Sequence, residues 1–256
     1  MNQHSPKTNQ SLGKALELLD LLLAHRRPMS LAELSAASGF PKSTAHLLLS
    51  TLRSYNYVEQ RPDGRYFLGM RLYECGRVIS AEWDISAVAR PFLEQLAEQT
   101  GGTAVVSYLG GGHILNLEQI ASRSGVQVLS EVGTLLPLHA TAQGKLYLST
   151  QSDADVCSLL RARGMPAFTP HTFTTQEAIL EQLQRIRQEG CAIENGEYKI
   201  GLRAVCAPVY DSSQTPRYAV GVVGLFRHVD SREFDQVIEA TKSIARQLSA
   251  ALGCRG

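Results

Sequence analysis

Short polar and basic side chains gather along residues 42–50. Apolar residues recur there at positions i, i+3, i+4 and i+7, which marks the core-facing side of a helix: Ala45, Leu48, Leu49 and Leu52. The other side chains then face outwards, and we expect contacts from Lys42, Ser43, Thr44, His46, Leu47 and Ser50. Hydroxyl, imidazole and ammonium groups near a helix N-terminus suit phosphates and base edges in the major groove of DNA.

Two arginines flank a turn shortly downstream. Strand-like runs surround Asp63-Gly64, a dipeptide typical of a β-hairpin. Arg61 and Arg65 lie beside its tip, where guanidinium groups would meet the DNA backbone or the minor groove. Each feature alone has an ordinary explanation, such as a solvated helix face or a common hairpin, so the prediction rests on their combination.

The elements that must position these side chains follow in a fixed order. A helix reaches about Ala24, and a second begins at Ser30, where Glu33 completes a capping box. That short helix ends at Gly39, and Pro41 suits the first turn of a third helix that runs to about Ser54. Three helices and a basic hairpin predict a winged helix-turn-helix over residues 1–69, although such domains can also serve protein contacts.

Composition sets the broad class. The net charge is +1, but residues 1–80 carry 10 Lys/Arg against 6 Asp/Glu, and the remainder carries 15 against 18. A basic head is typical of a phosphate-binding end, although chance could give this imbalance. Five well-separated cysteines indicate reduced thiols in a cytoplasmic protein. The polar N-terminus and the absence of a long apolar run favour neither export nor a membrane span.

The remaining chain reads as helices around a sheet. We expect helices over 71–82, 85–99 and 175–189, another after residue 142, and a last one from Ser231. Strand-like runs cover residues 103–109, 113–120, 125–129, 204–210 and 218–226. This order predicts an α+β domain with a central, mostly antiparallel sheet over residues 84–256, after a linker helix over 70–83. The linker's apolar seam predicts oligomerisation: Leu72, Cys75, Val78 and Ile79.

No catalytic set is visible. The histidines lack metal-ligand spacing, and Gly-x-Ser-x-Gly is absent, so we expect no enzyme activity, no metal and no cofactor. An enzyme with a fused DNA-binding head and an assembly factor that never touches DNA are the alternatives. Near Thr141 and Gly144, a small-residue turn leads into a helix whose N–H groups could hold an anion, or could be an ordinary helix cap.

Several motifs together resemble the IclR family of bacterial transcriptional regulators. They are SLAEL (30–34), GFPKSTAH (39–46), LPLHATAQGK (136–145), GCAIENGEY (190–198), GLR (201–203) and APVYD (207–211). Two positions depart from the family pattern. Leu47 stands where the family usually has Arg, which offers a thymine methyl an apolar contact instead. Asn56 replaces the usual Gly, a mild change because Asn tolerates positive φ.

The resemblance implies a sequence-specific transcriptional regulator that binds double-stranded DNA at an inverted repeat as a homodimer or homotetramer. A GAF-like domain would bind a small effector, a catabolic metabolite. Family alignment predicts these wall residues: Thr141, Ala142, Gln143, Gly144, Glu194, Ala204, Gly221 and Val223.

The apolar members of that wall, Ala204, Gly221 and Val223, predict a roomy pocket for a larger, partly apolar acid. Backbone N–H groups of residues 141–144 would anchor the acid, and Glu194 would face a hydroxyl or amine donor. The alternative is that these residues only pack the core and that the ligand lies elsewhere. Effector identity, operator sequence, and repression or activation stay open.

Overall fold

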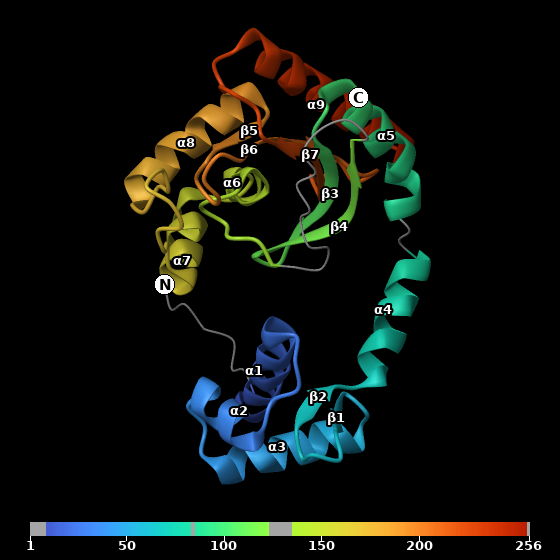
Figure 1. The fold of residues 1–256 in the computed structure, drawn as a ribbon, viewed down its shortest axis with the longest axis vertical. Coiled ribbons are helices and arrows are strands. Elements are labelled where there is room, and N and C mark those ends of the chain that lie inside the picture. The colour runs from blue at the N-terminus through green and yellow to red at the C-terminus, as the bar shows by residue number, and fades with distance from the viewer. Residues whose placement is uncertain (1–8, 83–84, 123–134, 255–256) are drawn as a thin grey trace, which may run out of the picture. The chain divides into compact units, whose positions relative to one another are not determined.

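The computed structural model describes residues 9–82, 85–122 and 135–254, so the strand predicted over residues 125–129 lies outside the described residues. The chain divides into two compact units, Met1–Asp84 and Ile85–Gly256 (Figure 1). Each unit has a hydrophobic core of its own. In the described part of the chain, no helix is long and apolar enough to cross a membrane.

The first unit contains the predicted three helices and hairpin. In chain order the elements are α1 Gln10–His25, α2 Leu31–Ser38, α3 Lys42–Ser54, β1 Val58–Gln60, β2 Tyr66–Leu68 and α4 Met70–Glu82. Its core takes residues from all of them except α4: Leu18, Leu22, Met29, Leu34, Ala45, Leu49, Val58 and Tyr66. The apolar face predicted for α3 is confirmed, because Ala45 and Leu49 are fully buried and Leu48 and Leu52 pack against the same core.

Local chemistry explains the boundaries of these helices. The predicted capping box is present: Ser30 Oγ accepts from Glu33 N–H, and Glu33 accepts from Ser30 N–H. These bonds, together with Arg27, hold the Glu33 pKa at about 2. Pro41 precedes α3 with extended backbone angles instead of lying in its first turn. Asn56 adopts a φ of 62°, which confirms the tolerance expected at this position.

A backbone bridge extends the hairpin. β1 and β2 pair antiparallel, with Val58 opposite Leu68 and Gln60 opposite Tyr66. Tyr66 also exchanges two backbone hydrogen bonds, of 2.7 and 2.9 Å, with Met29 in the segment before α2. The hairpin is therefore joined by hydrogen bonds to the segment that leads into the helix-turn-helix.

The second unit is a five-stranded antiparallel sheet with helices on both faces (Figure 1). The strand order is β4-β3-β7-β6-β5. The strands are β3 Thr103–Gly110, β4 His113–Ala121, β5 Ala192–Asn195, β6 Arg203–Val209 and β7 Tyr218–Gly224. The helices are α5 Ile85–Thr100, α6 Ala142–Ser149, α7 Asp153–Arg163, α8 Gln176–Glu189 and α9 Arg232–Ala251. The mostly antiparallel sheet predicted from the sequence is confirmed.

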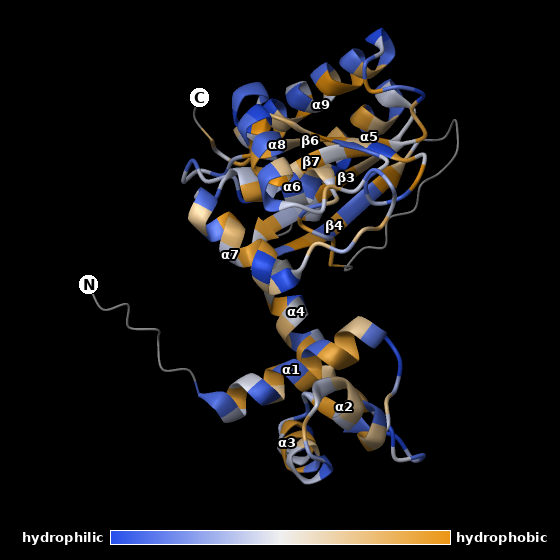
Figure 2. Ribbon diagram, turned by 90° about the vertical axis from the view of Figure 1, so that its left-hand side faces the viewer, coloured by the Kyte–Doolittle hydropathy of each residue, from blue (hydrophilic) through white to orange (hydrophobic). Residues whose placement is uncertain are grey.

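Alternation along the strands separates two cores. On β7, Val220 and Val222 join the core under α5 and α9, whereas Ala219 and Val223 face the core that includes α6 and α8. Helix α9 begins after the Ser231 cap and buries one apolar face, with its polar face outwards (Figure 2). The segment Gly111-Gly112 forms the two-residue turn between β3 and β4 with positive φ at both glycines.

The sequence reasoning missed two elements, α7 and β5. Helix α7 has clear end signals, a Ser152 cap and Gly164 after its last turn, but it buries only Val156 and Leu160. Strand β5 has four residues and pairs with β6 at the sheet edge. Both elements are too short or too exposed to give a strong hydrophobic period.

Candidate functional site

The outer face of α3 brings the predicted polar residues together. Lys42, Ser43, His46 and Leu47 are exposed, and Thr44 and Ser50 are half-buried on the same helix. Leu47 is 68% exposed and makes the centre of this face apolar. The first turn holds no acidic residue, and Pro41 has no side-chain group to cap the helix. The positive end of the helix dipole is thus presented beside Lys42 and Ser43.

The hairpin adds guanidinium groups to the same unit. Arg61 and Arg65 are exposed and joined by a backbone hydrogen bond of 2.8 Å across the turn. The Arg61 guanidinium lies 5.5 Å from the centroid of the Phe67 ring, and Arg65 lies 3.8 Å from the Asp63 carboxylate. Sequence reasoning missed Arg53, whose side chain leaves the last turn of α3 and hydrogen-bonds to Gln60 on the hairpin.

A small cavity of about 60 Å³ lies in the second unit between α6, the sheet and the segment after β5. Five of the eight predicted wall residues line it: Thr141, Gln143, Glu194, Ala204 and Val223. Sequence reasoning missed the other lining residues: Val105, Leu136, Tyr198, Lys199 and Leu202. Val105 could have been found from strand pairing, since it lies opposite Gly221, but the loop residues carry no such signal.

The other three predicted wall residues, Ala142, Gly144 and Gly221, are not among the lining residues. A Cβ atom at Gly144 would lie 2.4 Å from the Leu138 carbonyl oxygen, and one at Gly221 would lie 2.7 Å from the Val205 carbonyl oxygen. Both glycines therefore allow close backbone packing. A larger residue at Gly221 would displace the sheet before it reached the cavity, so this position cannot serve to fill the pocket.

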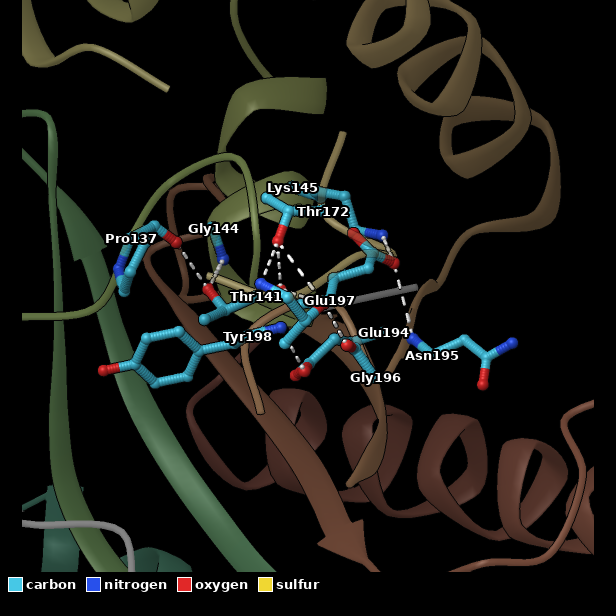
Figure 3. Close-up of polar contacts among 11 residues, drawn as sticks. Pro137, Thr141, Gly144, Lys145, Thr172, Glu194, Asn195, Gly196, Glu197 and Tyr198 are labelled. Atoms are coloured by element: carbon cyan, nitrogen blue, oxygen red, sulfur yellow. Dashed lines mark hydrogen bonds and ion pairs between the residues drawn. The ribbon is translucent and has the colours of Figure 1, made fainter. Parts of the chain in front are cut away.

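Thr141 caps α6 and uses one of the N–H groups expected to bind an anion. Its Oγ1 accepts from Gly144 N–H at 3.1 Å and donates to the Pro137 carbonyl at 2.7 Å (Figure 3). This arrangement corrects the expected role of Gly144, because its N–H is already bonded within the protein.

Glu194 is the buried acid of the cavity. Its side chain belongs to a residue that is only 5% exposed, and Oε1 accepts from the Tyr198 N–H at 3.1 Å. Burial raises the pKa of Glu194 from 4.5 to about 7, and the hydrogen bond from Tyr198 opposes this shift. The nearby Glu197 carboxyl raises the pKa and the Lys145 ammonium lowers it. The cavity can therefore offer either a carboxylate or a carboxylic acid near neutral pH.

A buried ion pair lies behind the cavity wall. Lys145 Nζ on α6 and Glu197 Oε1 are 2.6 Å apart, with side chains 0% and 4% exposed (Figure 3). Burial lowers the pKa of Lys145, although Glu197 opposes that effect. The Thr172 hydroxyl donates to the Glu197 carbonyl at 2.6 Å, and the Thr169 hydroxyl donates to the Gly196 carbonyl at 2.7 Å. These contacts fix the segment that carries Tyr198.

The sequence had not singled out either partner of this ion pair. The sequence signal that could have found Lys145 is a lysine in a helix whose other residues are mostly small or apolar, such as Leu146 and Leu148. Among the described residues, no group of three or more His, Cys, Asp or Glu side chains is placed to hold a metal ion.

Comparison with known proteins decides the family. The C-terminal domain model of bacterial transcriptional regulator IclR matches residues 78–250, and the IclR helix-turn-helix model matches residues 11–62. This chain belongs to the IclR family. The resemblance seen in the sequence is thereby confirmed.

Individual IclR-family members match along nearly the whole chain. The HTH-type transcriptional regulator XynR of Escherichia coli K12 is 33% identical, over 95% of this chain and 97% of the relative. A solved IclR transcriptional regulator from Alicyclobacillus acidocaldarius is 28% identical, with a TM-score of 0.75 over 95% and 98% of the chains. An IclR homologue from Microbacterium hydrocarbonoxydans, solved in complex with 4-hydroxybenzoate, is 22% identical, with a TM-score of 0.72 over 94% and 98%.

The IclR-family assignment fixes the class of function. The protein is a transcriptional regulator with an N-terminal helix-turn-helix domain that binds DNA and a C-terminal effector-binding domain. The family consists of regulators, not enzymes, which confirms the function expected from the sequence.

The raised pKa of Glu194 makes the stability of this IclR-family protein depend on pH. Stability due to the protonated acid is fully present below pH 4.5 and is lost as pH rises through about 7. The unfolding free energy of the wild type, measured in urea, should fall between pH 5 and pH 8. We expect Glu194→Gln to make this fall smaller by up to about 3 kcal/mol, because Gln does not ionise. The surface control Glu181→Gln should keep the wild-type pH dependence, and an unchanged dependence in Glu194→Gln would contradict the assignment.

Proposed function

We propose that the protein regulates transcription in the cytoplasm by binding an inverted-repeat operator as a dimer, under the control of an organic acid bound beside Glu194. We take residues 1–69 as the DNA-binding domain, 70–83 as the linker and 84–256 as the effector domain. The observation that carries the effector proposal is a cavity with apolar walls and a single buried carboxyl group.

The proposed DNA contacts divide into two kinds. Arg61 and Arg65 on the hairpin would neutralise phosphates, because exposed guanidinium groups at a wing tip suit backbone contact. Residues on the outer face of α3 would contact bases and nearby phosphates: Lys42, Ser43, Thr44, His46, Leu47 and Ser50. The exposed Leu47 supports an apolar contact with a thymine methyl group.

Substitutions should separate these two kinds of contact. Arg61→Ala or Arg65→Ala should weaken binding to all DNA sequences and reduce the salt slope by about 1, because one phosphate contact is lost. Ser43→Ala or His46→Ala should instead change sequence preference. Fluorescence anisotropy over a salt series, with specific and scrambled duplexes, measures both effects. Unchanged affinity in the arginine variants, with a steep salt slope, would contradict the wing assignment.

Dimerisation through the linker is supported by α4. Met70, Tyr73 and Val78 are 59–63% exposed on this helix, and Leu72 and Cys75 are only half-buried. Isolated short helices with apolar side chains in water are marginally stable, so a partner surface would stabilise this one. A single winged helix also covers too few base pairs for selective binding, whereas a dimer reads two half-sites. The family resemblance also implies that such dimers can pair into tetramers.

The linker proposal predicts a measurable assembly defect. Wild-type protein should sediment as a dimer or tetramer at micromolar concentration, and Val78→Glu should shift it towards smaller species because a charge would enter the apolar contact. The neighbouring exposed Arg77→Glu serves as the control for charge alone. A wild-type monomer, or equal assembly of both variants, would rule out this interface.

The effector proposal rests on the chemistry of the cavity. Ala204 and Val223 give it apolar walls, and Glu194 offers one oxygen-rich end for a hydroxyl or amine donor. Thr141 and Gln143 lie at the N-terminus of α6, beside the same space. A thermal-shift screen of organic acids made or consumed by products of neighbouring genes would identify ligands.

Filling the cavity should uncouple effector from operator. Ala204→Leu should abolish the effect of a screened acid on DNA binding, since the added side chain occupies a space of about 60 Å³. Operator affinity without the acid should stay at the wild-type value in anisotropy titrations. The exposed Ala167→Leu, outside the cavity lining, is the matched control. A full effector response in Ala204→Leu would refute the assignment of this cavity.

A further inference from the structure

A second, larger cavity of about 270 Å³ adjoins the cavity that holds Glu194. The two share Leu136 and Tyr198 as lining residues, so these side chains form the partition between them. Arg163 at the end of α7 and His113 at the start of β4 line the larger cavity but not the smaller one. The LPLHATAQGK motif supplies four of the lining residues, Leu136, Pro137, Leu138 and His139, but no ligand contact was expected of them from the sequence.

A partly apolar acid is too large for the smaller cavity alone and would have to occupy both cavities. A water molecule takes about 30 Å³, so a cavity of about 60 Å³ has room for only a small polar group. Typical small-molecule sites begin at about 300 Å³, a size that neither cavity has alone and that the two adjoining cavities reach together. A ligand that places one end beside Glu194 would extend past Tyr198 into the larger space.

The charges of the lining residues indicate which end of the acid lies in which cavity. The small cavity contains the Glu194 carboxyl, and its Lys199 ammonium lies over the Tyr198 ring, 5.7 Å from the centroid. A carboxylate placed there would face a second acid. The described residues that line the larger cavity include no Asp or Glu, and they include the Arg163 guanidinium. An anionic end is therefore better matched by the larger cavity.

The Arg163 guanidinium has further N–H donors for a ligand. Its Nη2 lies 2.8 Å from His113 Nε2, a contact that uses one of the five guanidinium N–H groups. A carboxylate can accept two parallel N–H bonds from the rest of the fork. Because Arg163 is exposed, its side chain can turn towards a ligand without loss of buried packing.

Aromatic rings form a wall between the two charged ends. The Phe168 ring lies 5.7 Å from His139 and 5.1 Å from Tyr198, edge-on to the latter. His139 is held by a 3.0 Å contact between Nε2 and the Pro166 carbonyl. This wall suits an alkyl chain or an aromatic ring between two polar ends.

We infer that the larger cavity is a second subsite of the effector pocket, in which Arg163 binds the carboxylate of an acid whose opposite end donates a hydroxyl to Glu194. The inference rests on the proposed function, since it assumes that the small cavity holds part of the effector. It reverses the orientation expected from the sequence, in which the acid end lay at residues 141–144.

The test uses linear ω-hydroxy acids of increasing chain length and the α,ω-diols of equal length, titrated into the full-length protein by calorimetry. Affinity for the hydroxy acids should rise with chain length until both cavities are spanned. Arg163→Gln should weaken the best hydroxy acid at least about tenfold, because a charge-assisted contact is lost. The diols should bind weakly and equally to wild type and to Arg163→Gln.

Arg161→Gln is the matched control, because Arg161 lies on the same exposed turn of α7 but outside the cavity lining. It should change affinity less than about twofold, as expected for a distant surface charge. Equal affinities in Arg163→Gln and Arg161→Gln, with a loss in Glu194→Gln, would overturn the second subsite and leave the small cavity as the effector site. If the wild-type protein binds none of these acids, or if Glu194→Gln and Arg163→Gln both bind them as wild type does, the effector site and its second subsite are both overturned.

Discussion

The buried pair of Lys145 and Glu197 is the contact on which the effector domain's pocket depends. Removing two charges from water costs several kcal/mol each, and only a close contact with further hydrogen bonds offsets that cost. The contact between Lys145 and Glu197 is 2.6 Å, and the Asn195 backbone N–H donates to the same Glu197 oxygen at 3.4 Å. The Thr172 hydroxyl donates to the Glu197 backbone carbonyl and so holds the segment that carries this acid. Because Lys145 lies on α6 and Glu197 in the segment after β5, their attraction holds two pocket walls together.

The same pair shapes the chemistry of Glu194. Two carboxyl groups and one ammonium group share a space from which water is largely excluded, so the second acid is costly to ionise. Within the described part of the chain, Glu197 Oε2 is buried without a hydrogen-bond partner. Burial is the main cause of the raised pKa of Glu194, and the ion pair adjusts that pKa in both directions, since Glu197 raises it and Lys145 lowers it.

Local patterns predicted much of this molecule. The capping box at Ser30 and the apolar face of α3 each depend on neighbours in sequence, and both are present. Family alignment suggested Gly221 as a wall residue, but alignment does not show how close the Val205 carbonyl lies, and Gly221 is not among the residues that line the cavity. Tyr198 and Lys199 reach the cavity from an irregular segment, whose path depends on the distant Lys145 and has no periodic signal.

The backbone bridge between Met29 and Tyr66 bears on how this regulator could evolve. It ties the hairpin to the chain that enters the helix-turn-helix, and because these are backbone bonds they do not depend on which side chains the two parts carry. Ser43 and Leu47, which are proposed to contact bases, are exposed and are not part of the buried core. Under the proposed function, a substitution at such a position would change operator preference while the buried core, and with it the folding of the domain, stays the same.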